Sequence, residues 1–345
     1  MILSSHGKHL ARFAGVISAA ILLVSGCTSV TSPNSGTSGS TTTSTPKQAA
    51  VSTGPQLGLI WNASDSTLRT LAGVPGSSQL GPALFPAGAY ATGAFAYPTQ
   101  TALLLDPKGN LQIMVLPSTQ PQTLAQGFST AASIVFAPRG AYAVVFSPGS
   151  SSVLEVSGLP LAPIANVITA TAAVQGAAIS DAGTLLLATS AGNGGAAVTS
   201  IAANGTRASL ATLGGFGGIG FIAGSEDSLV ADSAANTLSR YHNGSATILA
   251  SHANGLNQPF AVAASQDGHW AVTADQADSS LLRIDLTGAT APTLSTCSCS
   301  PTQLSALSGN AVFELAAPAA APGWMIEADG PSSRVLFIPP VRSGQ

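Results

Sequence analysis

The segments LVADSAANTLSRY (Leu229 to Tyr241), AVTADQADSSLLRID (Ala271 to Asp285) and WMIEADGPSSRVLFI (Trp324 to Ile338) share one pattern. Each has an apolar run, then Ala-Asp, then five small or polar residues, then a second apolar run. The pattern belongs to a unit that recurs about every 41 to 44 residues. A fixed period of this size in an all-strand chain indicates the stacked sheets of a β-propeller.

The polar residue that ends the second strand of each unit sets the alignment of the repeats. These residues are Asn62, Asp106, Ser147, Thr189, Asp232, Asp275 and Asp329. The last two are 54 residues apart, with the excess length around Cys297 to Asn310. Glycine-containing turns separate short apolar runs throughout, as hairpins require. The sequence therefore predicts an all-β fold, a single propeller of four-stranded antiparallel blades. Seven blades fit best, and six or eight stay possible.

Closure of the ring has two solutions in the sequence. The final unit has no room for a full fourth strand after Pro340. Residues 48 to 53 could supply that strand, or they could form the inner strand of the first blade. Either arrangement would remove free sheet edges, which a soluble β protein must otherwise protect.

Two stretches carry a family resemblance. Val230-Ala231-Asp232-Ser233-Ala234-Ala235-Asn236-Thr237 resembles the strand and turn of NHL and YVTN repeats. Pro259-Phe260-Ala261-Val262, followed by Gln266-Asp267-Gly268, resembles the start of the same blade. The resemblance extends over roughly residues 50 to 340. It implies a toroid that serves mainly as a binding platform, with some enzymes in the same families.

The first 26 residues have the features of a secretory signal. Lys8 and Arg12 precede an apolar stretch from Phe13 to Val24, which is shorter than the ~20 residues of a membrane-spanning helix. Leu23-Val24-Ser25-Gly26-Cys27 resembles the bacterial lipobox. That resemblance implies cleavage before Cys27 and a lipid on its sulfur. Thr28 is not the aspartate of the usual retention signal, so we expect delivery to the outer membrane; an ordinary secretory signal is the alternative.

A tether follows the predicted lipidation site. The sequence from Thr28 to Lys47 is almost entirely Ser, Thr, Gly and Pro, which cannot bury enough apolar surface to order itself. Twenty such residues reach roughly 25 Å. We therefore divide the chain into a signal peptide at 1–26, a lipid-anchored Cys27 with its flexible tether at 27–50, and a propeller at 51–345.

The charge content excludes some classes of partner. Only 7% of the residues are charged, against about 25% in a typical soluble domain. Nine basic and fourteen acidic residues follow Gly26, which gives a formal charge of −5. A nucleic-acid-binding protein would carry a basic patch, so nucleic acid is not an expected partner.

The recurring acids are the first candidate binding residues. Turns after the second strand and before the first strand open on one face of a propeller. Asp106, Asp232, Asp275 and Asp329, together with Asn62, are therefore expected to surround one rim. They could bind a cation or a partner there. The favoured interpretation is structural: each carboxylate accepts hydrogen bonds from backbone N–H groups of its own turn.

A second candidate is the loop Asn254-Gly255-Leu256-Asn257-Gln258-Pro259-Phe260. Asn257, Gln258 and Phe260 combine amides with an aromatic ring near the predicted channel mouth. This composition suits a glycan or a peptide. The alternative is that the loop simply begins a blade.

Cysteine and histidine point to no catalytic or metal site. Cys297 and Cys299 could form a disulfide, stay as free thiols or join a soft-metal site, with the disulfide favoured in an oxidising compartment. His242, His252 and His269 lack metal-ligand spacing and are expected in exposed turns. The chain has no nucleophile elbow and no phosphate-binding loop. No cofactor or metal is predicted.

These observations favour a cell-envelope lipoprotein whose propeller is a non-catalytic binding or scaffolding platform for a protein, peptide or glycan. The alternative is a propeller-fold enzyme, a hydrolase or lactonase or a quinone-dependent dehydrogenase, with its site in the central channel. Several acidic, Asn or His side chains meeting in that channel would favour the enzyme. An apolar channel would favour the platform.

Overall fold

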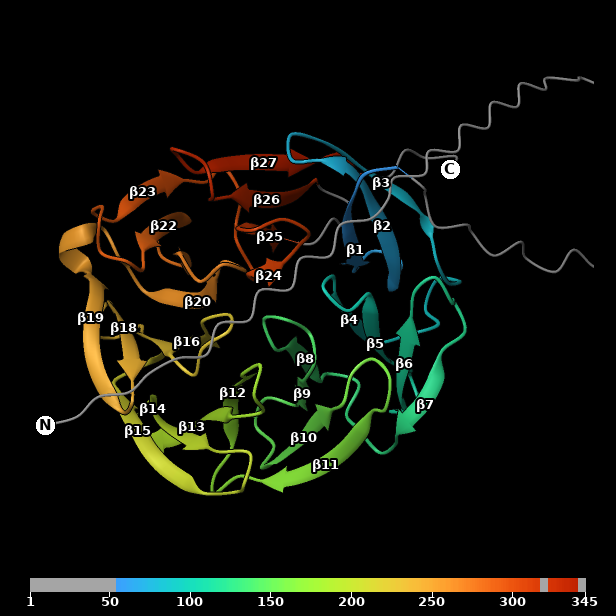
Figure 1. Ribbon diagram of the computed structural model, residues 1–345, viewed down its shortest axis with the longest axis horizontal. Helices are drawn as coiled ribbons and strands as arrows, with labels where there is room; N and C mark the ends of the chain where they lie inside the picture. The colour runs from blue at the N-terminus through green and yellow to red at the C-terminus, as the bar shows by residue number, and fades with distance from the viewer. Residues whose placement is uncertain (1–53, 317–321, 341–345) are drawn as a thin grey trace, which may run out of the picture. The chain divides into compact units, whose positions relative to one another are not determined.

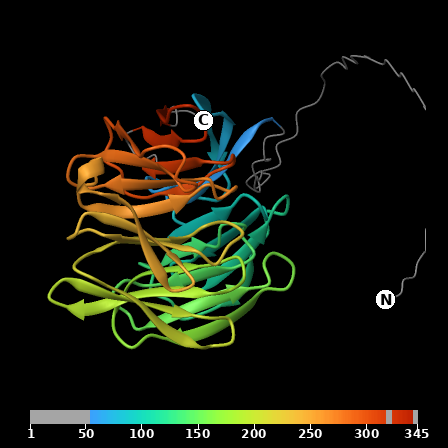
Figure 2. The same cartoon turned by 60° about the vertical axis from the view of Figure 1, so that its left-hand side comes forward.

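The computed structural model describes residues 54–316 and 322–340. These residues form seven antiparallel sheets, in each of which the strands lie in chain order. The sheets surround a common axis (Figure 1) and present their edges when the molecule is turned (Figure 2). The helical content of the described residues is one 3-10 turn, η1 (His252–Asn254). The chain is thus a seven-bladed β-propeller, as its repeats predict.

We number the blades 1 to 7 along the chain. Blades 1 to 3 contain β1 (Gln56–Asn62), β2 (Thr67–Val74), β3 (Ser77–Ala83); β4 (Thr92–Ala96), β5 (Thr101–Leu105), β6 (Leu111–Val115), β7 (Gln122–Ala125); β8 (Ser133–Phe136), β9 (Ala143–Phe146), β10 (Ser152–Ser157) and β11 (Ile164–Thr169). Blades 4 and 5 contain β12 (Val174–Ile179), β13 (Leu185–Gly192), β14 (Gly195–Ile201), β15 (Arg207–Leu213); β16 (Phe216–Phe221), β17 (Ser228–Asp232), β18 (Thr237–His242) and β19 (Ser245–Ser251). Blades 6 and 7 contain β20 (Pro259–Ala264), β21 (Trp270–Asp275), β22 (Ser280–Asp285), β23 (Thr293–Thr296); β24 (Ser305–Ala306), β25 (Val312–Ala316), β26 (Gly323–Glu327) and β27 (Arg334–Ile338).

The propeller has two rims. The connecting rim holds the turns between second and third strands and the links from one blade to the next. The hairpin rim holds the turns between first and second strands and between third and fourth strands. The carbonyl of Asp65, in the β1–β2 turn, accepts a hydrogen bond from Gly88 on the link to blade 2. The β1–β2 turn therefore lies on the connecting rim, so β1, β2 and β3 correspond to the second, third and fourth strands of the other blades.

The Ala-Asp turn of the last unit differs from the others. In blade 7, Ala328-Asp329 joins β26 to β27, the third and fourth strands. The expected alignment of Asp329 with the second-strand anchors is wrong, because β25 is the second strand. The 54-residue interval between Asp275 and Asp329 is long because the two residues lie at the ends of different strands of their blades. The fourth strand of blade 7 is β27, which ends before Pro340. Blade 7 therefore needs no strand from residues 48–53, which lie outside the described residues.

One buried position recurs in all seven second strands. Each residue there pairs with the third strand of its own blade, and successive members are 41 to 44 residues apart. The members are Leu59, Leu103, Val144, Leu186, Leu229, Val272 and Glu314. The first six lie in the apolar clusters between their own blade and the next. We call this the packing position, and blade 7 alone has a carboxyl group there.

Each junction between neighbouring blades has its own apolar cluster. The ring closes in the same way. Leu57, Ile60 and Leu71 of blade 1 pack against Val312 and Met325 of blade 7. Among the described residues, no strand is shared between blades 1 and 7. Side-chain packing, supported by a hydrogen bond from the backbone N–H of Ser308 to the carbonyl of Leu57 (2.7 Å), holds these two blades together.

Two arginines connect consecutive blades on the hairpin rim. Arg283, on β22, donates to the carbonyls of Ala328 (3.2 Å), Gly330 (2.7 Å) and Pro331 (3.3 Å) in the last turn of blade 7. Its guanidinium also lies 4.2 Å from the ring centre of Trp270. Arg240 occupies the equivalent place in blade 5 and donates to the carbonyl of Leu286 in blade 6. Buried charges of this kind require such partners.

We expect Arg283→Met to lower the free energy of unfolding by about 2–4 kcal/mol, because three carbonyls lose a charged donor at a buried site. Arg207→Met is the matched control. Arg207 is exposed and also joins two blades, with a single hydrogen bond to the carbonyl of Thr169. Its loss should cost less than about 1 kcal/mol. Urea denaturation of both variants measures the difference, and equal midpoints would contradict this role for Arg283.

Candidate functional site

The connecting rim brings together most of the predicted rim residues. Asn62, Asp232 and Asp275 end the second strands β1, β17 and β21, and Asp106 directly follows β5. Asp329 is on the hairpin rim, in the β26–β27 turn. The prediction that Asp329 shares a rim with the other acids is therefore wrong, because its turn follows a third strand and not a second one.

Hydrogen bonds within the turns occupy two of these acids. The carboxylate of Asp232 accepts from the backbone N–H groups of Gly214, Gly215, Ala234 and Ala235 at 2.8–3.1 Å. Asp106 accepts from the backbones of Lys108 and Asn110 and from the Asn110 side chain. Burial opposes ionisation of Asp106, but these hydrogen bonds outweigh it and hold its pKa below the ordinary value. Both carboxylates stabilise their turns, which was the favoured interpretation.

Asp275 differs from its counterparts because it is fully buried. Its Oδ2 accepts from the backbone N–H of Asn257 (3.0 Å) and from the Ser280 hydroxyl (3.1 Å), while Oδ1 has no hydrogen-bond partner. Burial raises its pKa to about 6; the two hydrogen bonds oppose the shift, and the charge of Asp278 adds to it. Asp275 therefore holds the loop before blade 6 and changes charge near pH 6.

The loop before blade 6 has mainly a structural role. The backbone N–H of Gln258 donates to the Asn236 side chain (2.7 Å), and Gln258 has a positive φ of 54°. Phe260 packs against the apolar cluster between blades 6 and 7. Asn257 is half-buried above Asp275, and Gln258 is exposed. Of the three predicted loop residues, Gln258 is the one available to a partner on the connecting rim.

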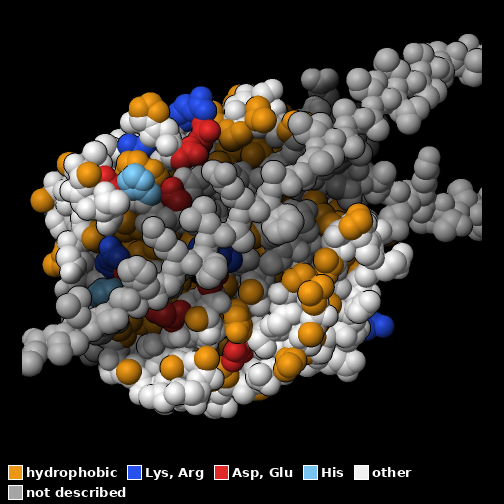
Figure 3. Space-filling model, in the orientation of Figure 1, with side chains coloured by type: hydrophobic (Ala, Val, Ile, Leu, Met, Phe, Trp, Pro, Cys, Tyr) orange, Lys and Arg blue, Asp and Glu red, His pale blue; other side chains and the backbone are white. Residues whose placement is uncertain are grey.

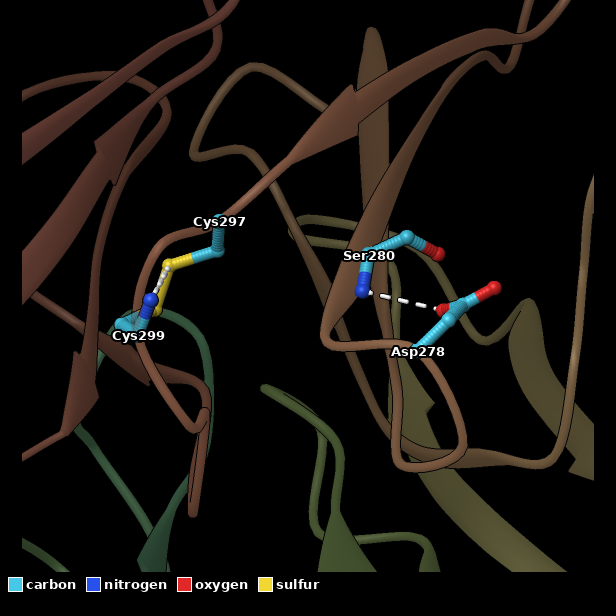
Figure 4. Close-up of a disulfide and its surroundings, with 4 residues drawn as sticks. All are labelled: Asp278, Ser280, Cys297 and Cys299. Atoms are coloured by element: carbon cyan, nitrogen blue, oxygen red, sulfur yellow. Dashed lines mark hydrogen bonds between the residues drawn. A yellow bond between two sulfur atoms is a disulfide. The ribbon is translucent and has the colours of Figure 1, made fainter.

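Cys297 and Cys299 form a disulfide just after β23 (Figure 4). The backbone N–H of Cys299 also lies 3.2 Å from the sulfur of Cys297. Both residues join the apolar cluster between blades 6 and 7, where they cover the outer part of that junction. Of the three alternatives left open by the sequence, the structure has the disulfide.

His242 and His269 pair with acids on the hairpin rim, whereas His252 Nδ1 lies 3.3 Å from the carbonyl of Leu256. His242 Nδ1 lies 2.7 Å from Asp227, which is also bound by Arg240. Burial raises the pKa of Asp227, and the hydrogen bonds from Arg240 and His242 more than offset this and lower it. His269 stacks on Trp270, and its Nε2 is 3.3 Å from Asp285.

Charged groups are sparse on the molecule. On the face shown in Figure 3 they gather in the left half of the view. Within residues 54–316 and 322–340, no three His, Cys, Asp or Glu side chains are grouped so that they could hold a metal ion.

The central channel contains a cavity of about 400 Å³. It is lined by the first strands of blades 2 to 7 and by β1 of blade 1, each of which lies at the inner edge of its sheet. The amide of Gln266 crosses the channel from blade 6 and donates to the carbonyl of Pro138 in blade 3 (3.0 Å), which partly closes the hairpin rim. The aromatic residues of the lining are Trp61, Phe95, Tyr97, Phe136, Phe221 and Phe313.

Glu314 is the channel residue that sequence reasoning did not identify. It lines the cavity from β25 and is 4% exposed. Its side chain bonds to Gln303, and its Oε1 has no hydrogen-bond partner. Burial raises the pKa to about 8, against the opposing effect of Gln303, so the group is mostly neutral at pH 7. The contrast with the other blades becomes visible once β25 is aligned with the other second strands, because the other six packing positions are Leu or Val.

Comparisons with known proteins agree on the fold alone. No family model matches the sequence, and no curated protein is similar to it. Among solved structures, a protein of unknown function from Desulfotomaculum acetoxidans is 14% identical (82% of this chain, 98% of that chain, TM-score 0.53). A chain of the mitotic checkpoint complex is 11% identical (74% and 86%, TM-score 0.54). The β-propeller domain of Cps50 (Swd1) from Myceliophteria thermophila is 13% identical (74% and 89%, TM-score 0.53).

We expect Asp275→Asn to stabilise the protein in a pH-dependent manner. The pKa of Asp275 is higher in the folded state, about 6 against 3.8. The folded wild type therefore binds the proton more tightly, and it loses stability as the pH rises from about 4 to about 6. Asparagine keeps an acceptor for Asn257 and Ser280 and cannot ionise. The stability difference between variant and wild type should grow by up to about 3 kcal/mol between pH 4 and pH 8.

Urea denaturation across this pH range measures the difference. Asp232→Asn is the control, because that carboxylate accepts four backbone N–H groups and asparagine cannot satisfy all of them. It should destabilise the protein at pH 8. A constant difference for Asp275→Asn from pH 4 to pH 8 would contradict the raised pKa.

Proposed function

We propose that this protein is a cell-envelope lipoprotein whose seven-bladed propeller binds a protein, peptide or glycan partner without catalysis. A lipid on Cys27 would hold it at a membrane, most simply the bacterial outer membrane, and residues 28–50 would place the propeller clear of the lipid headgroups. Two lipid chains or more suffice for stable anchoring. The repeat pattern favours a place among the NHL and YVTN-like propellers.

The composition of the channel lining carries the non-catalytic part of the proposal. A propeller hydrolase, lactonase or dehydrogenase would need several polar side chains directed at one point of the channel. The described lining has many apolar and aromatic groups and one carboxyl group, on Glu314. On the connecting rim, Asp106, Asp232 and Asp275 accept hydrogen bonds from their own turns or from the loops that join the blades. These features suit recognition better than acid–base chemistry.

The anchor rests on the sequence motif at Leu23 to Cys27, which lies outside the described residues. Within the described part of the chain, no helix is long and apolar enough to cross a membrane. The partner surface that we favour is the connecting rim around Gln258, which combines an exposed amide with neighbouring polar turns.

We expect Cys27→Ser to move the protein from the membrane fraction to the soluble fraction, because serine has no sulfur to carry the lipid. Fractionation of cells followed by immunoblotting measures this, and incorporation of labelled palmitate should be lost in parallel. Cys299→Ser is the control, since it leaves the lipobox intact and should remain membrane-bound. Unchanged attachment of the Cys27→Ser protein would exclude the lipid anchor.

We expect Gln258→Arg to reduce capture of partners, because a long cation would replace a neutral exposed amide on the connecting rim. Pull-down after mild crosslinking of cells compares it with wild type. The control is Asn204→Arg, an exposed turn residue between β14 and β15 on the hairpin rim. If Asn204→Arg loses the partner and Gln258→Arg retains it, the partner binds the hairpin rim and not the connecting rim.

A further inference from the structure

The cavity in the channel has room for a small molecule. Its volume of about 400 Å³ falls within the ordinary range of small-ligand sites. Six aromatic residues belong to its lining, and the inner strands add backbone carbonyls along their edges. The lining thus combines apolar surface with acceptors, and it contains no lysine, arginine, histidine or aspartate. Glu314 and Tyr97 are its titratable side chains.

Glu314 is unfavourable for the stability of the fold. Its buried carboxyl oxygen lost its hydrogen bonds to water on folding and has no partner in the protein. Leucine or valine fills the same packing position in the other six blades, so the geometry of the ring does not require a carboxyl group. A buried carboxyl group on a residue that lines a cavity is a candidate for contact with a ligand.

The short inner strand of blade 7 explains why Glu314, on the second strand, belongs to the lining of the cavity. β24 has two residues, whereas the inner strands of blades 2 to 6 have four to six. Glu314 pairs with Ser305 of β24 and Met325 of β26. Behind so short a strand, the second strand itself contributes Phe313 and Glu314 to the lining of the cavity.

We propose that the cavity binds a small organic cation, a protonated primary amine with an apolar body, whose ammonium group pairs with Glu314. An ammonium has three donors, which fit the Glu314 carboxylate, the amide oxygen of Gln303 and a backbone carbonyl of an inner strand. The apolar body contacts the aromatic lining, and the ring faces attract the cation.

Binding would also change the protonation of the site. Near pH 7 the carboxyl group is mostly neutral in the empty channel. The ammonium favours the carboxylate, so the proton leaves Glu314 for the solvent as the ion pair forms. Each amine bound at pH 7 should therefore release up to about one proton. The inference goes beyond the proposed function and does not depend on Cys27 or on the connecting rim.

The test uses calorimetric titration of the purified protein at pH 7 with 2-phenylethylamine, cyclohexylmethylamine and n-hexylamine. 2-Phenylethanol is the neutral control with the same body. We expect saturable binding of at least one amine, weaker binding of the alcohol by about ten-fold or more, and quenching or enhancement of Trp61 fluorescence. Repeating the titration in buffers of different ionisation enthalpy gives the number of protons released.

Glu314→Gln keeps the shape of the side chain and cannot ionise. It should weaken amine binding by about ten-fold or more, abolish proton release and leave binding of the alcohol unchanged. Glu155→Gln is the matched control, a half-buried glutamate on β10 away from the cavity, and it should bind amines like wild type. Circular dichroism and the melting temperature confirm that both variants fold.

Three results would each overturn the proposal: no saturable binding of any of the three amines, equal affinity for the amine and the alcohol, or unchanged amine binding by Glu314→Gln. The results for Cys27→Ser and Gln258→Arg test the proposed function. They do not test the cavity.

Discussion

The fold depends on apolar contact between neighbouring sheets. A four-stranded sheet this small cannot bury both of its faces alone, so each blade is stable only between two others. Seven apolar clusters, one for each junction, meet this requirement. The contact between blades 1 and 7 is of the same kind as the other six. For this reason the ring closes without a strand shared between its ends in the described part of the chain.

The repeats made the architecture predictable, but the same repeats gave a wrong strand assignment for Asp329. A turn such as that of Asp232 indicates a hairpin. The local sequence does not show whether the hairpin joins the second and third strands of a blade or the third and fourth. Asp329 was therefore aligned with the wrong strand. The position of Glu314 in β25 corrects the alignment, because it restores an even spacing from Val272. The strand that Asp329 follows is defined by the pairing between strands, and a local sequence pattern carries no information on that pairing.

The candidate site was less predictable than the fold. Acidic residues are rare in a chain with 7% charged residues, so the recurring Asp106, Asp232 and Asp275 were candidate binding residues. Their carboxylates proved to be acceptors for nearby backbone and side-chain donors, which is what polar residues at turns commonly do. Glu314 belongs to no local sequence motif, and its burial and its cavity exist only in three dimensions. Once strand pairing assigns β25 as the second strand, a comparison of equivalent positions across the blades identifies Glu314.

The exchange of leucine or valine for glutamate at one packing position out of seven breaks the rotational symmetry of the ring. Seven similar wedges would offer a guest in the channel seven equivalent orientations. A single carboxyl group at the junction of blades 7 and 1 leaves one orientation preferred, off the axis and beside the seam where the propeller begins and ends. A repeated architecture can thus acquire a directional pocket through a change of one residue, while the six unaltered junctions retain their packing.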